Sequence, residues 1–487
     1  MPDKSIEKLI KSLKKGELKA FTSKVKSKSP EYYNLFLQLK KKKKDDNITN
    51  IKNAQQRKYL YDSLLESLNS NTNTIDAKIL KKLLNTETLF KRQLTKEAWK
   101  EAQKAQKLAQ KHERFGLLIQ ILEWKKNIGF YLDEFTRQDY LKLLDFEEQI
   151  IHLQSAYLQA KNLYMEILGL KKEIGYLPLH YDKKKFSKFN LTIHIGEESK
   201  RTVFYLRMTK AIYYWMLKDH QNEYRLTKEN IQAIDYTVDR TEYLMAYLEH
   251  LTSCVCNAQF NELIDVLSNL KEKYIKGYFG FNVNLELKLF YYASNYELMS
   301  YAFMGDAEKL TMKINEVEKG IKYWDKNLSK EMIVVVYTAL KMAWFFLGDI
   351  KKSKFYINKI LNESVKDVRK DAIEDAMLFN LIIVFEKDDV YYQEQVVDKT
   401  LRYFKTNNMT DYFEYKFADA LKRNIYKKDI FINVFKVIKN QLPKYFYQLD
   451  DNRYFSENFF PVYIWLLSKI KKKPILEIVK DWYYNNL

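Results

Sequence analysis

Apolar residues recur along this chain at spacings of three and four positions, from one end to the other. In "EAWKEAQKAQKLAQK", Ala98, Ala102, Ala105 and Ala109 fall on one stripe of a helix. The alternation of apolar and polar residues that is typical of strands is nearly absent. One strand-like segment, "FNLTIHIGEESK" (189–200), lies between two helical regions and is either an extended loop or a short crossover. The pattern predicts an all-α protein.

One helical unit recurs. The stretch "MAWFFLGDIKKSKFYINKIL" (342–361) combines an aromatic helix end, a Gly-Asp break and a second amphipathic run. "MSYAFMGDAEKLTMKINEVE" (299–318) has the same shape, and more divergent copies occupy 212–231, 252–271 and 385–404. Their expected turn residues are separated by 40, 47, 43 and 40 positions; they are Lys218, Ala258, Gly305, Gly348 and Asp388. This recurrence predicts helix pairs that stack and bury their apolar faces against one another.

The chemistry of the break supports a packed antiparallel pair. Gly348 permits the left-handed conformation that ends a helix at low cost, and Asp349 can cap the next helix by accepting backbone N–H bonds. The expected packing faces of the two helices are Tyr337, Leu340 and Trp344 on the first, and Ser353, Ile357 and Ile360 on the second. The small Ser353 should allow the two helices to approach closely.

This unit, Tyr337-x-x-Leu340-x-x-x-Trp344-x-x-x-Gly348-Asp349-x-x-x-Ser353-x-x-x-Ile357-x-x-Ile360, resembles a tetratricopeptide repeat. The period exceeds the usual one of about 34 residues, so the resemblance implies lengthened, divergent helices. It covers roughly 203–404 and, more weakly, 94–122. The whole chain also resembles a group of tetratricopeptide-like proteins common in Bacteroidetes, through "LIKSLKKGELKAF", "QRKYLYDSLLESL" and "AQKLAQKHERF". The resemblance implies a right-handed superhelix of stacked antiparallel helix pairs, and no particular reaction.

The pattern divides the chain into four regions. Residues 1–70 are expected to form a small basic helical region, and 71–180 a helical repeat followed by a coiled-coil-like hairpin of two long helices (112–128 and 147–174). The repeats occupy 200–405. Residues 406–487 are expected to form closing helices that cap the apolar end of the stack.

Composition agrees with this picture. The 487 residues include 46% hydrophobic and 30% charged residues, which excludes bulk disorder, and only 11 Gly and 6 Pro, which disfavours turn-rich β folds. The charged N-terminus lacks a signal-peptide pattern, and no apolar run approaches the roughly 20 residues needed to span a bilayer. We therefore expect a cytoplasmic protein without a membrane span.

The formal net charge is +20, much of it near the two ends of the chain. Lysine runs attract phosphate backbones, anionic lipid or acidic proteins, but a solvated surface that keeps the chain soluble is the favoured explanation. The densest run supplies the candidate anion-binding residues Lys40, Lys41, Lys42, Lys43 and Lys44.

No catalytic motif occurs, whether a phosphate loop, a dinucleotide fingerprint, a zinc-protease helix or a nucleophile elbow. The six histidines are scattered singly, so structural or surface roles are expected, although a fold can gather some of them. His180 and His194, which flank the irregular segment, are the pair to check for proximity. Cys254 and Cys256 should point apart on a helix, which disfavours a disulfide or a shared metal site. We predict no catalytic residue, metal site or cofactor.

The remaining candidate site is a groove lined by the first helix of each pair. Its expected residues are Tyr292, Asn295 and Met299 in one unit, then Thr338, Met342 and Phe345 in the next. A register error of one or two residues would bury some of them. Such a groove is typical of a non-catalytic scaffold that binds a peptide or partner protein, here an acidic one. The alternatives are a nucleic-acid-associated protein that docks through its basic N-terminal region, and an enzyme with dispersed site residues.

Overall fold

The structure of the protein is a computed structural model. It describes residues 6–7, 9–10, 13, 15–28, 30–41, 54–70, 74–174, 183–189, 199–235, 237–279, 283–325, 327–362, 370–387, 389–410, 412–440, 447–450, 453–455 and 459–486. The chain divides into two compact units, residues 1–152 (unit 1) and 153–487 (unit 2), and the division falls inside one long helix.

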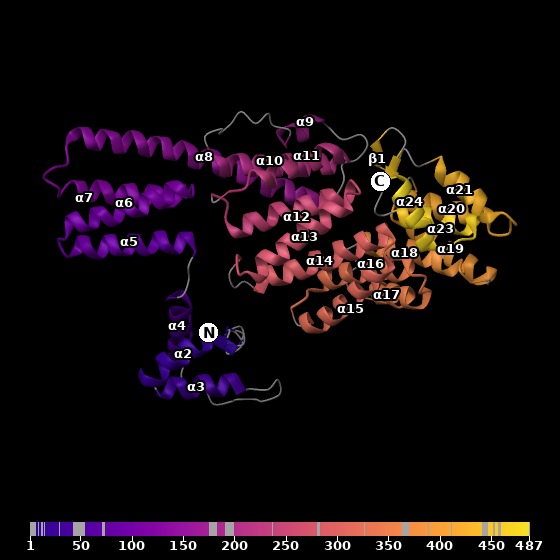
Figure 1. Cartoon of the computed structure of the whole chain (residues 1–487), viewed down its shortest axis with the longest axis horizontal. Coiled ribbons are helices and arrows are strands. Elements are labelled where there is room, and N and C mark those ends of the chain that lie inside the picture. The colour runs from indigo at the N-terminus through magenta and orange to yellow at the C-terminus, as the bar shows by residue number, and fades with distance from the viewer. Residues whose placement is uncertain are drawn as a thin grey trace. The chain divides into compact units, whose positions relative to one another are not determined.

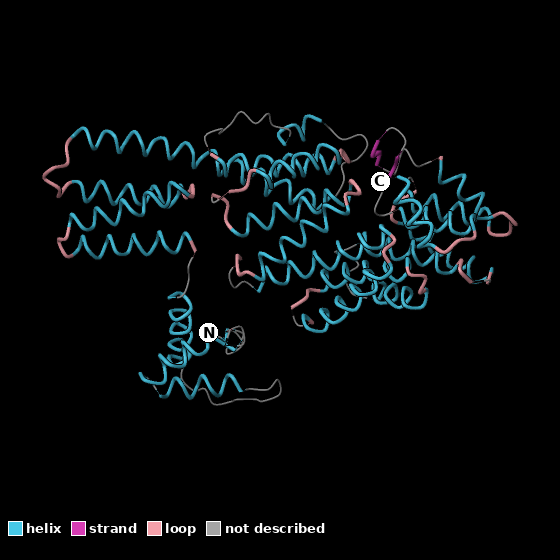
Figure 2. The backbone as a smooth tube through the Cα atoms, in the orientation of Figure 1, coloured by secondary structure: helices cyan, strands magenta, loops and turns pink. Residues whose placement is uncertain are grey.

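Helices account for almost all of the described chain (Figure 2). The helices before the division are α2 (Lys15–Lys28), α3 (Pro30–Lys41), α4 (Ala54–Ser70), α5 (Ile75–Lys91), α6 (Thr95–Lys111) and α7 (Phe115–Gly129), and the helix that contains it is α8 (Arg137–Ile174). Unit 2 continues with α9 (Lys183–Phe186), the 3-10 helix η1 (Ser187–Phe189), α10 (Lys200–Met216), α11 (His220–Gln232), α12 (Arg240–Cys256), α13 (Phe260–Ile275), α14 (Val283–Met304), α15 (Ala307–Trp324), α16 (Lys330–Phe346), α17 (Ile350–Asn362), α18 (Lys370–Val384), α19 (Val390–Thr406), α20 (Phe413–Asn424), α21 (Ile430–Lys439), α23 (Phe460–Lys471) and α24 (Ile475–Asn486).

Unit 1 contains two helical groups. Helices α2, α3 and α4 surround a small apolar cluster that includes Phe21, Phe36 and Leu64. Helices α5, α6 and α7 pack side by side, and the predicted alanine stripe of α6 is buried along its whole length. Small side chains on that stripe let the neighbouring helices approach closely, which explains the run of alanines.

Unit 2 is built from helix pairs, as predicted. Helices α10 to α21 form six consecutive pairs, in which each helix contacts the next one along the chain (Figure 1). The first helices α12, α14, α16, α18 and α20 also contact one another in succession. Each pair therefore buries its apolar surface against its neighbours. This confirms the predicted all-α stack of helix pairs.

Four of the predicted turn residues have the left-handed conformation that was expected at the glycines. Lys218, Ala258, Gly305 and Gly348 all have positive φ, between 54° and 79°. After α16, the Gly348 N–H donates to the Phe345 carbonyl and the Asp349 N–H to the Trp344 carbonyl, both at 2.9 Å. These two bonds form a Schellman motif that satisfies the last carbonyls of the helix.

The aspartates that follow three of these turns cap the next helix, as expected. Asp219, Asp306 and Asp349 accept a backbone N–H from the residue three positions later, at 3.2, 3.0 and 2.9 Å. Within the α16–α17 pair, the hydroxyl of the small, fully buried Ser353 donates to the Lys341 carbonyl at 2.9 Å. The fifth expected turn residue, Asp388, lies outside the described residues.

Other left-handed turns among the described residues were not predicted. Gln93, Glu113 and Lys472 have φ of 61°, 49° and 54°, and they join α5 to α6, α6 to α7 and α23 to α24. None carries the Gly-Asp signal of the repeat. Left-handed turns between packed helices therefore also occur outside the region where the sequence predicts them.

The C-terminal helices return to the middle of unit 2. Helix α23 contacts α18 and α21, and α24 contacts α14. Phe460 at the start of α23 lies 5.3 Å from the Phe303 ring of α14, centroid to centroid. Tyr483 of α24 accepts a hydrogen bond from Asn261, 222 positions earlier, at 3.1 Å. Helices α23 and α24 therefore cover apolar surface in the middle of the stack as well as capping its C-terminal end.

Two local features differ from expectation. A two-stranded antiparallel hairpin, β1 (Tyr447–Asp450) and β2 (Arg453–Phe455), pairs Tyr447 with Phe455 and was not predicted. In the expected long hairpin only α8, with 38 residues, is long, whereas α7 has an ordinary 15.

Residues 190–198 of the strand-like segment lie outside the described residues. No helix in the described part of the chain is both apolar and long enough to cross a bilayer.

Candidate functional site

The six predicted groove residues fall into two groups. Tyr292, Asn295 and Met299 of α14 and Thr338 of α16 are half-buried, so part of each side chain reaches the surface. In contrast, Met342 and Phe345 of α16 are buried in the core, with Phe345 fully inaccessible. The prediction that these two line an open groove is therefore wrong.

The reason lies in how α16 is packed. Phe345 makes edge-to-face contacts with Phe346 and with Phe379 of α18, at 5.8 and 5.3 Å between ring centroids. Helix α16 contacts α14, α15, α17 and α18, so it is apolar and buried on several faces. A helix surrounded in this way has no single polar stripe from which a groove register can be taken.

Most of the other predicted site residues lie outside the part of the chain that the structure describes. Lys40 is exposed near the end of α3, and the backbone of Lys41 closes that helix. Lys42, Lys43 and Lys44 lie outside the described residues, as do His180 and His194. Anion binding by this lysine run remains a prediction.

The fold does gather two other histidines. Among the described residues, two groups of three side chains each bring a histidine, a glutamate and a cysteine within 4.8 Å of one another, measured between potential ligand atoms. We call them the outer triad (His220, Glu223 and Cys256) and the inner triad (His250, Cys254 and Glu262). Both lie among α11, α12 and α13.

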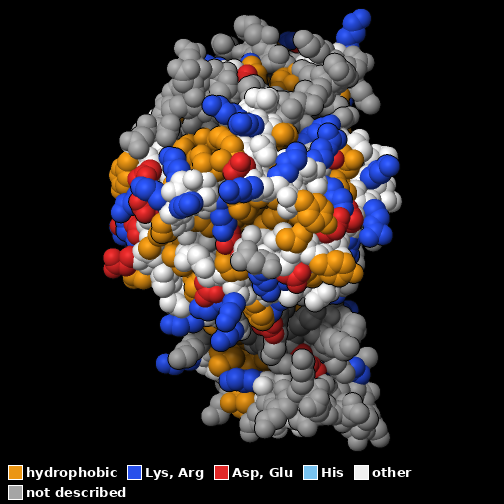
Figure 3. Space-filling model, turned by 90° about the vertical axis from the view of Figure 1, so that its right-hand side faces the viewer, with side chains coloured by type: hydrophobic (Ala, Val, Ile, Leu, Met, Phe, Trp, Pro, Cys, Tyr) orange, Lys and Arg blue, Asp and Glu red, His pale blue; other side chains and the backbone are white. Residues whose placement is uncertain are grey.

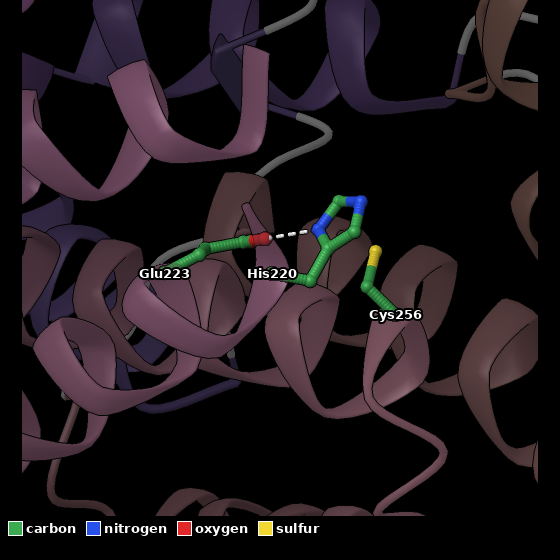
Figure 4. A group of neighbouring side chains, drawn as sticks. All are labelled: His220, Glu223 and Cys256. Carbon is green, nitrogen blue, oxygen red and sulfur yellow. Dashed lines mark hydrogen bonds and ion pairs between the residues drawn. The ribbon is translucent and has the colours of Figure 1, made fainter. Parts of the chain in front are cut away.

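The outer triad is almost completely buried (Figure 4). Glu223 Oε2 lies 2.7 Å from His220 Nδ1, one helical turn apart on α11, while Cys256 comes from the end of α12. Burial raises the pKa of Glu223 well above its usual range; Lys171 opposes this shift and Glu249 reinforces it. The close N–O distance is that of a hydrogen-bonded pair beside a thiol.

The inner triad converges on one histidine nitrogen. His250 and Cys254 are one turn apart on α12, and Cys254 Sγ lies 3.6 Å from His250 Nε2. Glu262, in the first turn of α13, places Oε1 at 3.1 Å from the same Nε2. The imidazole is fully buried, whereas the Glu262 side chain is about a quarter exposed (26%).

Neighbours on α11 hold this arrangement. Thr227 Oγ1 lies 3.0 Å from His250 Nδ1, and it also contacts the Ser253 hydroxyl at 2.8 Å. The other carboxylate oxygen of Glu262 accepts bonds from the Tyr224 hydroxyl and from the Lys228 ammonium, the latter at 3.0 Å. Oε1 is thereby left facing the imidazole.

Burial favours the uncharged forms of both the imidazole and the thiol of the inner triad. Burial lowers the pKa of His250 despite the opposing Glu262 carboxylate, so the imidazole is neutral near pH 7. Burial also strongly raises the pKa of the Cys254 thiol. A buried thiol that resists ionisation is a poor nucleophile, so the group does not have the properties of a cysteine catalytic site.

The spacing of the two cysteines predicted their separation correctly, but the two triads were not predicted. Cys254 and Cys256 are free and buried, and they belong to different groups, as their spacing on a helix requires. A search for histidine pairs alone overlooked the i,i+4 pair His250 and Cys254, and the i,i+3 pair His220 and Glu223. Including Cys and Glu as partners would have flagged both.

Comparison of the chain with protein-family models, with curated proteins and with solved structures gives no match.

Proposed function

We propose that this protein is a non-catalytic interaction scaffold of the tetratricopeptide-like class, which binds a peptide or a segment of a partner protein in the cytoplasm. The observation that carries the proposal is the run of consecutive helix pairs in unit 2, three of which join through a left-handed turn followed by an aspartate cap. Stacks of this kind expose extended surfaces built from many helices, and such surfaces suit elongated ligands. A right-handed superhelix belongs to the same proposal.

The net charge of the chain supports a partner with acidic residues. The face of unit 2 shown in Figure 3 carries apolar and basic side chains interspersed with acidic ones. On α14, Tyr292 and Met299 are half-buried, which suits amphipathic contacts with a bound segment. The net charge of +20 would attract an acidic partner and speed its association.

The C-terminal helices restrict where a ligand can bind. They cover the end of α14 near Phe303, and Lys480 of α24 approaches the turn at Gly305. The expected binding surface is therefore the earlier part of α14 together with the half-buried positions of α16. Met342 and Phe345 are not among the proposed contact residues, because the packing of α16 buries both of them.

Peptide binding can be tested with matched variants. We would select acidic peptides on the full-length protein and measure their affinity by fluorescence anisotropy. Tyr292→Ala and Met299→Ala should each weaken binding about fivefold or more, as removal of a contact worth about 1 kcal/mol would. Met312→Ala, on the exposed face of α15, should leave the affinity unchanged. Equal effects of all three variants, or no selectable peptide, would argue against the proposal.

A second candidate function is nucleic-acid binding, and one described cluster favours it. The Lys273 ammonium lies 4.6 Å from the Tyr243 ring centroid and 5.6 Å from that of Tyr278, and Tyr243 stacks on Tyr247 at 4.4 Å. Aromatic rings beside basic groups are typical of single-strand binding surfaces. Tyr243 is buried, so the exposed Tyr278 is the ring of this cluster on which a base would stack. Retention on a random oligonucleotide with a steep salt dependence, reduced by Tyr278→Ala, would favour this function over the scaffold.

A further inference from the structure

We propose that the inner triad, His250, Cys254 and Glu262, binds a divalent metal ion of the zinc type that joins α12 to α13. Nothing in the proposed scaffold function requires such a site. The inference rests on the ligand chemistry, on the distances between the ligand atoms and on the support that the imidazole receives from α11.

The ligand set selects the class of metal. An imidazole nitrogen, a thiolate sulfur and a carboxylate oxygen together suit a borderline-soft ion such as Zn²⁺. Calcium and magnesium prefer ligand sets made only of oxygen, so a thiol among three ligands disfavours them.

Two of the three distances between the ligand atoms are known, and both fit a tetrahedral ion. With bond lengths of about 2.0 Å to nitrogen and oxygen and about 2.3 Å to sulfur, adjacent ligands lie about 3.6 Å apart for N and S and about 3.3 Å for N and O. The inner triad has 3.6 Å from His250 Nε2 to Cys254 Sγ and 3.1 Å from Nε2 to Glu262 Oε1. In the outer triad the corresponding N–O distance is 2.7 Å, which is too short for two ligands of one ion.

The surroundings prepare the imidazole for this role. A metal-binding histidine commonly engages its second nitrogen in a hydrogen bond that fixes the ring, and Thr227 Oγ1 lies 3.0 Å from His250 Nδ1. Glu262 is about a quarter exposed, so an ion and a solvent ligand would enter the site from its side. On binding, the Cys254 thiol gives its proton to the solvent and its sulfur binds as a thiolate.

The ion would connect consecutive elements of the stack. His250 and Cys254 lie near the end of α12, and Glu262 lies at the start of α13, across the left-handed turn at Ala258. Because Thr227 and Tyr224 come from α11, the same site also ties the preceding pair to this one. We therefore expect the stability of α11, α12 and α13 towards unfolding to depend on the bound metal.

Cobalt provides a direct test, because a thiolate bound to Co²⁺ gives a charge-transfer absorption that water-bound Co²⁺ lacks. Chelator-treated, full-length protein should take up about one equivalent of Co²⁺ with this band and with strong visible d–d bands, and Zn²⁺ should displace it. Cys254→Ser should lose the charge-transfer band. Cys256→Ser, a matched change two positions away in the outer triad, should keep it.

Two further variants keep the test informative if Cys254→Ser folds poorly. Glu262→Gln should keep the band but bind Co²⁺ more weakly, and Thr227→Val should weaken Zn²⁺ binding by about 10- to 100-fold, the usual effect of losing an outer hydrogen bond. Added Zn²⁺ should raise the Tm of the wild type and of Cys256→Ser. Absence of the band in the wild type, or its loss in Cys256→Ser with retention in Cys254→Ser, would overturn the proposal.

Discussion

Lys341 is the most completely buried charged residue described in unit 2. Its side chain has no exposed surface, its ammonium bonds the Asp375 carboxylate of α18, and it lies 3.6 Å from the centroid of the Phe379 ring. Burial lowers the pKa of Lys341, whereas Asp375 favours its charged form. A buried ion pair contributes little net stability, but loss of one partner leaves an uncompensated charge in the core.

We therefore expect Asp375→Asn to destabilise unit 2 by about 3–5 kcal/mol in urea unfolding, because the Lys341 ammonium would lose its counter-charge. The double variant Lys341→Met/Asp375→Leu removes both charges and should recover most of this loss. If the double variant is as unstable as the single one, packing rather than charge dominates at this position.

A second buried pair makes stability depend on pH. Arg201 of α10 bonds Glu242 of α12, and Glu242 Oε1 also accepts the Tyr205 hydroxyl at 2.8 Å. Burial alone would raise the pKa of Glu242, but Arg201 and these hydrogen bonds outweigh it and hold the pKa below its ordinary 4.5. The unfolded chain therefore takes up this proton first as the pH falls.

The stabilisation from Glu242 should be complete above about pH 4.5 and should disappear as the pH falls through the lower pKa of the folded state. Glu242→Gln should cost about 3 kcal/mol at pH 7, because Arg201 loses its counter-charge. The difference in unfolding free energy between the two proteins, measured from pH 7 down to pH 3, should shrink in the acid range. A constant difference would contradict this assignment.

At the scale of elements, two turns with the same backbone conformation have different surroundings. Gly305 and Gly348 have φ of 71° and 79°. A Cβ at Gly348 would meet nothing within 4 Å, whereas one at Gly305 would lie 3.1–3.2 Å from the backbone and Cβ of Lys480. Only the turn at Gly305 is covered by α24.

Gly348→Ala should therefore cost about 1 kcal/mol, the usual penalty for a left-handed residue with a Cβ. Gly305→Ala should cost at least about 1 kcal/mol more, because it also crowds α24. Chemical unfolding of the two variants measures this difference. Equal losses would mean that α24 does not press against the turn.

The sequence predicted these elements well where a repeat provided a second signal. Lys218 and Ala258 lack the glycine that marks a left-handed turn, but the period identified them. Gln93 and Lys472 have the same conformation outside the repeats and were missed, since a single left-handed non-glycine residue leaves no local sequence signal. For the hairpin a signal did exist, because "YQLDDNRYF" places Asp-Asn between two aromatic runs.

The candidate site was much less predictable, for two physical reasons. Helix α16 is buried on several faces, so periodicity did not distinguish Thr338, which reaches the surface, from Phe345, which does not. The inner triad joins Glu262 to His250 and Cys254 across a turn, and only the packing of α12 on α13 brings them together. Long-range proximity of this kind is invisible to motif spacing within one helix.

At the scale of the whole molecule, unit 2 is held together by contacts between distant parts of the sequence. Phe460 is buried against Phe303 of α14 and against Trp482 of α24, at 5.3 and 4.4 Å between ring centroids. A simple repeat array contacts only its neighbours. Here the last helices, α23 and α24, pack against the middle of the array. We therefore expect these helices and the middle of the array to unfold together.

Phe460→Ala tests this coupling, because it removes a buried ring that α14, α23 and α24 share. We expect a loss of about 3–5 kcal/mol and faster amide hydrogen exchange both in α24 and at the end of α14, although the two are far apart in sequence. Phe355→Ala, at a half-exposed position (53%) on α17, is the control and should change stability by no more than about 0.5 kcal/mol. Exchange that accelerates in α23 and α24 but not in α14 would show that these helices close the stack without supporting its interior, and the inner face of α14 would then be available to a ligand.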